Sequence, residues 1–211
     1  MDLFNHPPKF IKVLFPHIIW EIEPDGILIT IDDGPSEDTG KILEVLDRYG
    51  IKAIFFCTGK NIEKYPANFQ KIVNSGHLIG NHGYAHKQLL FSSKRIHDKS
   101  FKKTDDLIKN ITGASAKLVR PPYGRFNHHT FKALKKLNKT MMLWSLLSGD
   151  HTGDFAHVRR LIDSYLHDRS IVVLHDNKKS KDIFAESIEY IVQTCKDRGI
   201  TVKDPNSFKY D

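Results

Sequence analysis

The sequence alternates short apolar runs with longer stretches of helical periodicity along almost its whole length. Strands are predicted at residues 27–33, 53–57, 77–82, 117–123, 140–147, 170–176 and 199–203. Helices are predicted between them, at residues 36–50, 65–76, 92–111, 127–138, 155–168 and 182–197. Apolar strands separated by helices are typical of a parallel sheet that helices cover. A doubly wound open sheet fits this order, but about seven strands favour an α/β fold of the distorted (β/α) barrel type, similar to the TIM barrel.

Length and composition suit one globular domain. The chain has 211 residues, of which 40% are hydrophobic and 27% charged, and this is enough to bury one core. Residues 27–211 carry the predicted strands and helices, and residues 1–26 are predicted to be an N-terminal extension that packs on the barrel. Two cysteines, Cys57 and Cys195, are too few for a disulfide framework.

Charge and hydropathy indicate neither a nucleic-acid partner nor a transmembrane segment. The net charge is +7, but the basic residues are scattered and no nucleic-acid-binding module is recognisable, so we expect no nucleic-acid partner. No apolar run approaches the ~18 residues that a transmembrane helix needs. Residues 1–26 lack the apolar core of a signal peptide, which favours a cytoplasmic protein, while prior removal of a leader would allow a cell-envelope location. The sequence indicates no oligomeric state.

Polar residues that can carry chemistry follow several of the predicted strands. Asp32 and Asp33 end the strand 27–33, and His82 ends the third strand with His86 four residues later. Arg120 and Tyr123 end the fourth strand, Asp150 follows the fifth and His175 lies near the end of the strand 170–176. A single histidine after a strand is usually an ordinary surface residue. Because carboxyl ends of parallel strands meet at one edge, their joint occurrence predicts a site there.

These residue types suit metal-assisted hydrolysis. Two histidines and one carboxylate make a three-ligand metal site with open positions, which lowers the pKa of a bound water to about 7 and polarises a carbonyl. A second carboxylate can act as general base and a histidine on the opposite wall as general acid. Adjacent residues of a strand point to opposite sides, so Asp32 and Asp33 could serve separate tasks. The predicted reaction is hydrolysis of an amide or ester.

The motifs that contain these residues resemble those of a known family. The segment TIDDGP is similar to the T-F-D-D-G-P motif of the polysaccharide deacetylases of the NodB-homology type (carbohydrate esterase family 4), with Ile31 in place of Phe. HGYAH resembles their H-[ST]-x-x-H motif, RPPYG their R-x-P-Y motif and VVLH their closing L-x-H-type motif. The matches run in the family's order from residue 30 to residue 175, so residues 27–211 would form a NodB-homology catalytic domain.

The resemblance implies roles for individual residues. Asp33, His82 and His86 would hold one divalent metal ion, for which zinc is expected and cobalt, nickel and iron are alternatives. Asp32 would be the general base, held in place by Arg120, and His175 would be the general acid. The backbone N–H of Tyr123 would help to stabilise the oxyanion.

Substrate contacts are also implied by the resemblance. Leu174 would line a small pocket for the acetyl methyl group, and Tyr123, Trp144 and Asp150 would contribute to substrate binding. The expected substrate is an N-acetylated glycan, such as peptidoglycan or a chitin-like N-acetylhexosamine polymer, from which acetate is released. O-acetyl groups use the same chemistry. Alternatives are a hydrolase of a linear or cyclic amide that is not a sugar, and a glycan-binding domain with little activity.

One motif departs from the family pattern, which resembles W-x-V-D-S-x-D-W near the fifth strand. In WSLLSGDH, Leu147 stands where an Asp is expected and His151 where a Trp is expected. If Leu147 leaves His175 without a carboxylate partner, His175 should hold its proton less well than in a family member that carries the Asp. Ser145 and Asp150 are the candidate replacements, and strand alternation favours Ser145.

Overall fold

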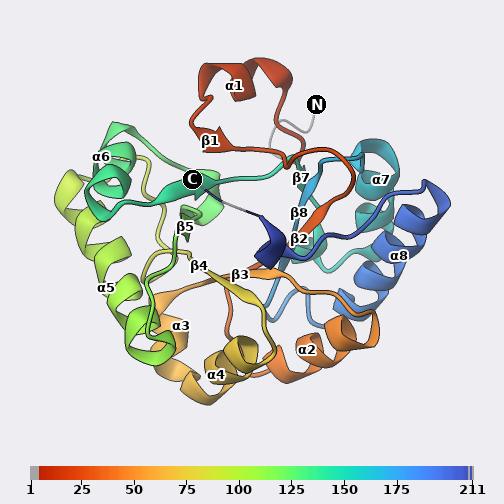
Figure 1. The fold of residues 1–211 in the computed structure, drawn as a ribbon, viewed down its shortest axis with the longest axis horizontal. Helices are drawn as coiled ribbons and strands as arrows, with labels where there is room; N and C mark the ends of the chain where they lie inside the picture. Colours follow the sequence, from red (N-terminus) through yellow and green to blue (C-terminus); the bar gives the residue numbers. More distant parts are fainter. Residues whose placement is uncertain (1–4, 209, 211) are drawn as a thin grey trace.

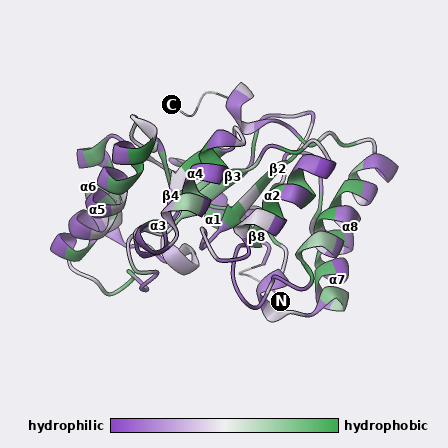
Figure 2. Cartoon of the chain, turned by 90° about the horizontal axis from the view of Figure 1, so that it is seen from below, coloured by the Kyte–Doolittle hydropathy of each residue, from purple (hydrophilic) through white to green (hydrophobic). Residues whose placement is uncertain are grey.

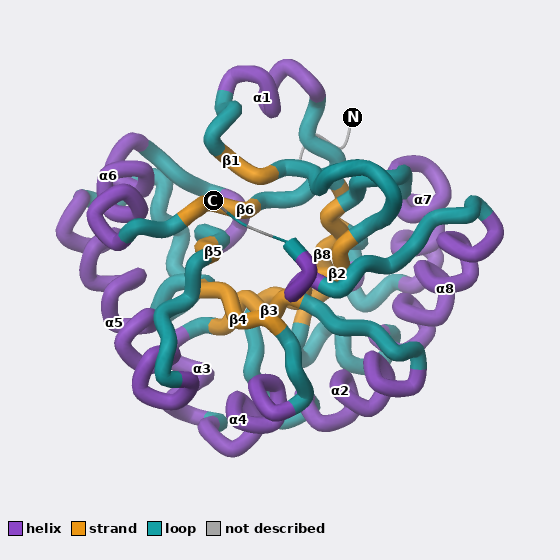
Figure 3. The backbone as a smooth tube through the Cα atoms, viewed as in Figure 1, coloured by secondary structure: helices purple, strands orange, loops and turns teal. Residues whose placement is uncertain are grey.

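The structure is a computed structural model that describes residues 5–208 and residue 210. Within this part of the chain, eight strands form one sheet in which every pair of neighbours is parallel, in the order β1-β6-β5-β4-β3-β2-β8-β7. The strands are β1 (Ile18–Ile19), β2 (Leu28–Asp32), β3 (Ile54–Cys57), β4 (Leu78–Asn81), β5 (Leu118–Val119), β6 (Thr140–Met142), β7 (Leu146–Leu147) and β8 (Ile171–His175). The sheet curls around a central axis (Figure 3), so the prediction of a distorted (β/α) barrel is confirmed.

Helices surround the sheet as a ring (Figure 1). They are α1 (Lys9–Leu14), α2 (Thr39–Arg48), α3 (Gly59–Lys64), α4 (Pro66–Asn74), α5 (Lys94–Thr112), α6 (His128–Leu137), α7 (Phe155–Tyr165) and α8 (Phe184–Asp197). The strands β2 and β3 are mostly apolar in Figure 2, while the helices carry both apolar and polar stretches. Among the described residues, no helix is both long and apolar enough to cross a membrane.

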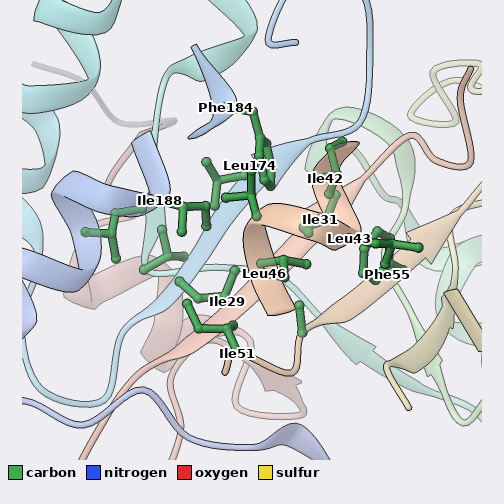
Figure 4. Close-up of a cluster of buried hydrophobic side chains, with 14 of the residues drawn as sticks. Ile29, Ile31, Ile42, Leu43, Leu46, Ile51, Phe55, Leu174, Phe184 and Ile188 are labelled. Carbon is green, nitrogen blue, oxygen red and sulfur yellow. The ribbon is translucent and has the colours of Figure 1, made fainter. Parts of the chain in front are cut away.

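The strands divide the core into two layers because successive side chains point to opposite faces. Ile29 and Ile31 of β2 face the helices, where they pack with residues of α2 and α8 (Figure 4). Leu28 of β2 and Val173 of β8 belong to a second cluster inside the barrel. The same alternation directs Asp32, the last residue of β2, toward the inside of the barrel.

Some elements differ from the sequence prediction. The predicted strand 140–147 is divided into β6 and β7, which lie toward opposite ends of the strand order, because the segment between them crosses the barrel. Part of its backbone bonds to a side chain instead of a strand: Arg120 donates to the carbonyls of Met142 and Leu143 at 3.2 and 2.8 Å. The predicted strand 199–203 is reduced to one bridge, Ile27 to Val202. The strand β1 and the helices α1 and α3 were not predicted.

The N-terminal segment, defined here as residues 5–22, fills the part of the ring between α6 and α7 (Figure 1). Its strand β1 pairs with β6, so it contributes an edge strand to the sheet as well as packing on the barrel. Phe15 packs edge-on against Phe126 near α6, with ring centroids 5.1 Å apart, and the His6 ring stacks on Tyr165 of α7. Residues 18 and 19 are therefore part of the same sheet as the strands of the barrel.

Candidate active site

A cavity of about 650 Å³ opens at the carboxyl ends of the strands, a size typical of ligand sites. The side chains that line it come from the ends of β2, β7 and β8 and from the loops after β2, β4, β5, β6, β7 and β8. They are Asp32, Asp33, His82, His86, Tyr123, Arg125, Trp144, Leu147, His151, His175, Asn177, Lys178 and Lys179. The expected gathering of polar strand-end residues at one edge is therefore present in the structure.

Asp33, His82 and His86 form one cluster of potential metal ligands in this cavity. Nε2 of His86 lies 3.0 Å and Nε2 of His82 lies 3.7 Å from Oδ1 of Asp33. The two aspartates do not point to opposite sides as strand alternation suggested, because Asp33 has φ 76° and leaves the extended conformation. Both carboxylates consequently line the same cavity, and Oδ2 of Asp32 is 3.8 Å from Nε2 of His82.

Hydrogen bonds orient His82 and Asp33 from behind. Nδ1 of His82 donates to the carbonyl of Arg120 at 2.7 Å, which leaves Nε2 as the ring's free ligand atom. Asn177 donates to Oδ2 of Asp33 at 2.8 Å, and Asn61 donates to the Asp33 carbonyl at 2.7 Å. His82 and Asp33 are thereby fixed before any ion binds, and the His86 ring lies against the Tyr123 ring, with centroids 4.5 Å apart.

The chemistry of the cluster fits a divalent cation. Oδ1 of Asp33 is buried and has no well-aligned hydrogen-bond donor among the described residues, although the two imidazoles approach it. Burial lowers the pKa of His82, so its ring is neutral near pH 7 and can act as a ligand. Burial alone would raise the pKa of Asp33, but His86, His175 and His82 lower it well below its usual range. A carboxylate and two imidazoles suit zinc and its transition-metal neighbours.

Asp32 is held by a buried guanidinium. Nη1 of Arg120 donates to Oδ1 of Asp32 at 2.7 Å and to Thr30 at 2.8 Å, and the Arg120 side chain is fully buried. The guanidinium also lies over the Phe56 ring at 4.1 Å. Because Oδ1 is engaged with Arg120, Oδ2 is the oxygen of Asp32 that faces the histidine cluster.

His175 has a carboxylate partner in Asp150, one of the two candidate replacements named from the sequence. Oδ1 of Asp150 lies 2.7 Å from Nδ1 of His175, and Oδ2 accepts the His175 backbone N–H at 2.7 Å. Burial alone would lower the pKa of His175, but the charge and hydrogen bond of Asp150, with help from Asp33 and Asp32, raise it to about 9. His175 is therefore protonated near pH 7. Ser145, the residue favoured from strand alternation, donates instead to Ile171.

The predicted role of Asp150 in substrate binding is also wrong. Its side chain is fully buried, and its oxygens accept hydrogen bonds from His175 and from Ser148. Asp150, His151 and His175 lie close enough to be considered as metal ligands, but the two oxygens of Asp150 are already occupied by these donors. Asp150 is therefore the carboxylate partner of His175, and His151 is a neighbouring imidazole.

Leu174 does not line the cavity. It is fully buried on the helix-facing side of the sheet, beside Phe184 and Ile31 (Figure 4), because His175 points inward and its neighbour on an extended strand points outward. Leu147 and Trp144 supply the apolar wall instead, and Tyr123, of which 57% is exposed, lies at the rim. Leu147, first noted as an unexpected residue, is thus part of the site.

Three of the six described non-glycine residues with positive φ lie at the cavity. Asp33, His86 and Tyr123 have φ values of 76°, 50° and 61°, in the left-handed region that non-glycine residues seldom adopt. Strained conformations of this kind cost about 1–3 kcal/mol each and are common at functional sites. At Tyr123 the conformation belongs to the short 3-10 turn at Pro122–Gly124, which directs the backbone along the cavity edge.

Several residues of the site were missed from the sequence. Asn177 orients Asp33 but lies in the loop after β8, where no pattern marks it. Asp176 is buried behind the site and accepts hydrogen bonds from Ser36 and Thr39, so it holds the turn that follows Asp33. His151 lies 5.3 Å from His175 between ring centroids. The sequence signal that could have identified His151 is its position directly after Asp150.

Comparison with known proteins agrees with this geometry. The family model described as "Polysaccharide deacetylase" matches residues 21–142. A peptidoglycan-N-acetylglucosamine deacetylase of Bacillus cereus is 36% identical over 128 residues, which cover 60% of this chain and 46% of that protein. The peptidoglycan-N-acetylmuramic acid deacetylase PdaC of Bacillus subtilis is 28% identical over 82% of this chain and 36% of that protein. The chain thus spans less than half the length of either relative.

Solved structures share the fold. The crystal structure of the Bc1960 peptidoglycan N-acetylglucosamine deacetylase, in complex with a naphthalenyl N-oxidanyl-benzamide, matches with a TM-score of 0.86 and 26% identity, over 95% of this chain and 96% of that chain. BA3943 of Bacillus anthracis, described as a CE4 family pseudoenzyme, matches with a TM-score of 0.81 at 21% identity, over 90% of this chain and 67% of that chain, and shows the fold alone. With a family model over more than half of its length, the chain belongs to the polysaccharide deacetylase family.

Proposed function

We propose that the protein hydrolyses N-acetyl groups of a carbohydrate, with peptidoglycan or a chitin-like N-acetylhexosamine polymer as the substrate class, and releases acetate. The single observation that supports this most strongly is the opposite protonation of two groups in one cavity. Asp33 and His82 provide deprotonated ligand atoms beside His86, while His175 keeps its proton. The relatives named above are peptidoglycan deacetylases, which supports the same substrate class.

In this proposal Asp33, His82 and His86 hold one divalent cation, with zinc favoured and cobalt, nickel and iron as alternatives. When bound, the cation supplies Lewis acidity, which polarises the acetyl carbonyl and acidifies water at the site. The Arg120 carbonyl behind His82 and the Asn177 amide behind Asp33 would hold these ligands in place.

Asp32 is the proposed general base. It accepts a proton from water as the water oxygen forms a bond to the acetyl carbonyl carbon. Arg120 keeps Oδ1 of Asp32 engaged, so that Oδ2 faces the cavity and receives the proton. The backbone N–H of Tyr123, at the cavity edge, is the proposed donor to the oxyanion that develops on the carbonyl oxygen.

His175 is the proposed general acid. It donates its Nε2 proton to the amide nitrogen as the C–N bond breaks, which yields acetate and a free amine on the sugar. Asp150 stabilises the protonated ring and fixes its orientation through Nδ1, so the proton for transfer is on the opposite nitrogen. The acetyl methyl group is expected to contact Leu147 and Trp144, the apolar part of the cavity wall.

The test is acetate release from N-acetylglucosamine oligosaccharides, N-acetylated peptidoglycan fragments and O-acetylated xylan, after chelation and after addition of zinc or cobalt. We expect cation-dependent release from the N-acetylated glycans, and little from the same protein carrying Asp32→Asn. Binding of glycans without acetate release would replace the proposal with a non-catalytic glycan-binding role. Turnover of small amides alone would show that the substrate is not a carbohydrate.

A further inference from the structure

We propose that the N-terminal segment builds a second sugar-binding subsite beside the catalytic cavity, so that the protein recognises a glycan over at least two neighbouring sugar rings. The proposal rests on the proposed function, because the neighbouring cavity is taken to hold the reacting sugar. The second hollow, called here the apolar subsite, has a volume of about 240 Å³. Its walls include Pro8, Phe10 and Trp20 of the N-terminal segment and Tyr123, Phe126 and Trp144 of the barrel.

The apolar subsite is continuous with the catalytic cavity. Tyr123 and Trp144 line both, so a ligand that passes over these two rings occupies both hollows. The backbone at Gly124 packs closely on the Trp144 ring, because a Cβ atom added at Gly124 would lie 2.5 Å from Cη2 of Trp144. This continuity favours a ligand that extends out of the catalytic cavity over one that binds independently of it.

The chemistry of the walls suits a sugar ring. All the lining residues are uncharged, and five of them are aromatic: Phe10, Trp20, Tyr123, Phe126 and Trp144. A pyranose ring has apolar C–H faces that pack on flat aromatic surfaces, while its hydroxyl groups stay at the open side. An anionic or strongly basic ligand would find no charge partner among these residues. A repeating glycan next to a deacetylation site meets these requirements.

The apolar subsite is built in advance of binding. Trp20 donates from Nε1 to the Phe15 carbonyl at 3.1 Å, and Lys12 forms an ion pair with Glu21, so the turn of the N-terminal segment is held at both sides. The backbone N–H of Leu147, a residue of the catalytic cavity, donates to the Asn5 carbonyl at 2.8 Å. Because the walls are already ordered, little conformational entropy is lost when a ligand binds.

A membrane surface is the competing occupant, since Phe10, Val13 and Leu14 of α1 are 66%, 78% and 65% exposed and Lys9 and Lys12 lie beside them. The sugar is favoured because Phe10 turns toward a concave hollow that shares two walls with the catalytic cavity. Val13 and Leu14 line neither hollow. This difference between Phe10 and Val13, on one helix, provides a matched pair of variants.

The test uses the chain's own fluorescence, because its only two tryptophans, Trp20 and Trp144, both line the apolar subsite. The full-length protein is titrated with mono- and tetra-N-acetylglucosamine, without measuring turnover. We expect the tetrasaccharide to bind more tightly. In Phe10→Ala the ratio of tetrasaccharide to monosaccharide affinity should fall by about threefold to tenfold. Val13→Ala should keep the wild-type ratio.

Three outcomes would overturn the proposal: an unchanged ratio in Phe10→Ala, an equal fall in Val13→Ala, or a loss of binding to vesicles of phosphatidylglycerol in Phe10→Ala with intact sugar binding. The last result would assign the face to a membrane. Circular dichroism confirms that both variants fold. Because binding is read without turnover, a Phe10-dependent preference in a protein that releases no acetate would sustain the apolar subsite and remove only the proposed activity.

Discussion

Asp32 and Asp33 are adjacent in sequence but have different surroundings. A buried guanidinium holds Oδ1 of Asp32, whereas two imidazoles and the Asn177 amide surround Asp33. The difference arises from the left-handed backbone at Asp33, which turns its side chain into the same cavity from a second direction. A proton acceptor and a cation ligand can therefore occupy neighbouring positions without competing for one partner.

The first prediction separates the two aspartates. Asp32→Asn should retain the cation and lose turnover by about 10²–10⁴-fold, because a positioned general base contributes an effect of that size. Asp33→Asn should lose the cation itself, since an amide is a weaker ligand for zinc than a carboxylate. Metal content after gel filtration and kcat on an N-acetylated oligosaccharide measure the two effects. Equal metal loss in both variants would refute the division of roles.

The second prediction concerns the proton on His175. Its protonated form is the proposed acid, so turnover should fall as pH rises through its pKa, which Asp150 holds near 9. Asp150→Asn removes the opposing charge and lowers this pKa, so the alkaline limb of kcat should move to lower pH by on the order of one to two units. The measurement is the pH profile of kcat with the cation saturating.

Leu147→Asn is the matched control for this profile, because Leu147 lines the cavity while Nδ1 of His175 is already bonded to Asp150. We expect its alkaline limb to stay at the wild-type pH, even if its KM rises. A limb that stays in place in Asp150→Asn would show that His175 is not the group whose titration limits turnover.

At the scale of elements, strand register positions the reacting groups. Asp32 and His175 are register partners at the ends of β2 and β8, and Arg120 follows β5 across the barrel. Arg120 lies on the Phe56 ring of β3, and Phe56 in turn lies against Gly80 of β4. The base is thus supported by three neighbouring strands through side-chain packing.

The third prediction tests this support. A Cβ atom at Gly80 would lie 2.4 Å from Cδ1 of Phe56, so Gly80→Ala must displace the ring beneath Arg120. We expect a loss of about 1–3 kcal/mol in the free energy of unfolding, with a fall in kcat. Gly40→Ala is the control, because nothing lies within 4 Å of a Cβ there and Gly40 is in the helix α2. It should leave kcat unchanged and raise stability by up to about 1 kcal/mol. Urea unfolding measures both, and equal stabilities would contradict the packing argument.

The elements that are buried in the core could be predicted from the sequence, because burial requires apolar residues in a regular pattern. The strands β2, β3 and β8 lie between two core layers, so their apolar runs are visible in the sequence. The helix α1 has no buried residue, and its amino acids therefore carry no burial pattern to detect. The grouping of Asp33, His82 and His86 followed from their position at strand ends. The partner of His175 did not, because Gly149, with φ 82°, turns the chain so that Asp150 lies under His175 and strand alternation no longer applies.

At the scale of the whole molecule, the cavity joins segments that are far apart in the chain. Its proposed ligands lie in loops after β2 and β4, and Asn177, which holds Asp33, follows β8. A cation bound to Asp33, His82 and His86 would therefore connect the loops after β2 and β4, and Asn177 would link the loop after β8 to them through Asp33. Binding to the folded state alone should stabilise the entire fold, because the unfolded chain does not present these ligands together.

The fourth prediction follows from this coupling. Zinc at 100 times its dissociation constant should stabilise the protein by about 2.7 kcal/mol, which corresponds to a rise in Tm on the order of 5–10 °C. His82→Ala should abolish the rise, whereas Asp32→Asn should keep it. Differential scanning calorimetry of chelated and zinc-loaded protein provides the measurement. A wild-type rise in His82→Ala would place the ion elsewhere.

The pairing of β1 with β6 has a consequence for self-association. Ile18 and Ile19 occupy the hydrogen-bonding side of Met141 and Met142, and the edge that remains is only two residues long and begins after Pro16. Short, proline-flanked edges resist the addition of a foreign strand, whereas an uncovered β6 would be a template for one. We expect a chain restricted to residues 21–211 to form concentration-dependent oligomers in size-exclusion chromatography under conditions where the full chain elutes unchanged on dilution. An unchanged elution of the shortened chain would show that β6 is shielded by another part of the fold. By covering the edge of β6, β1 would protect the sheet from edge-to-edge aggregation.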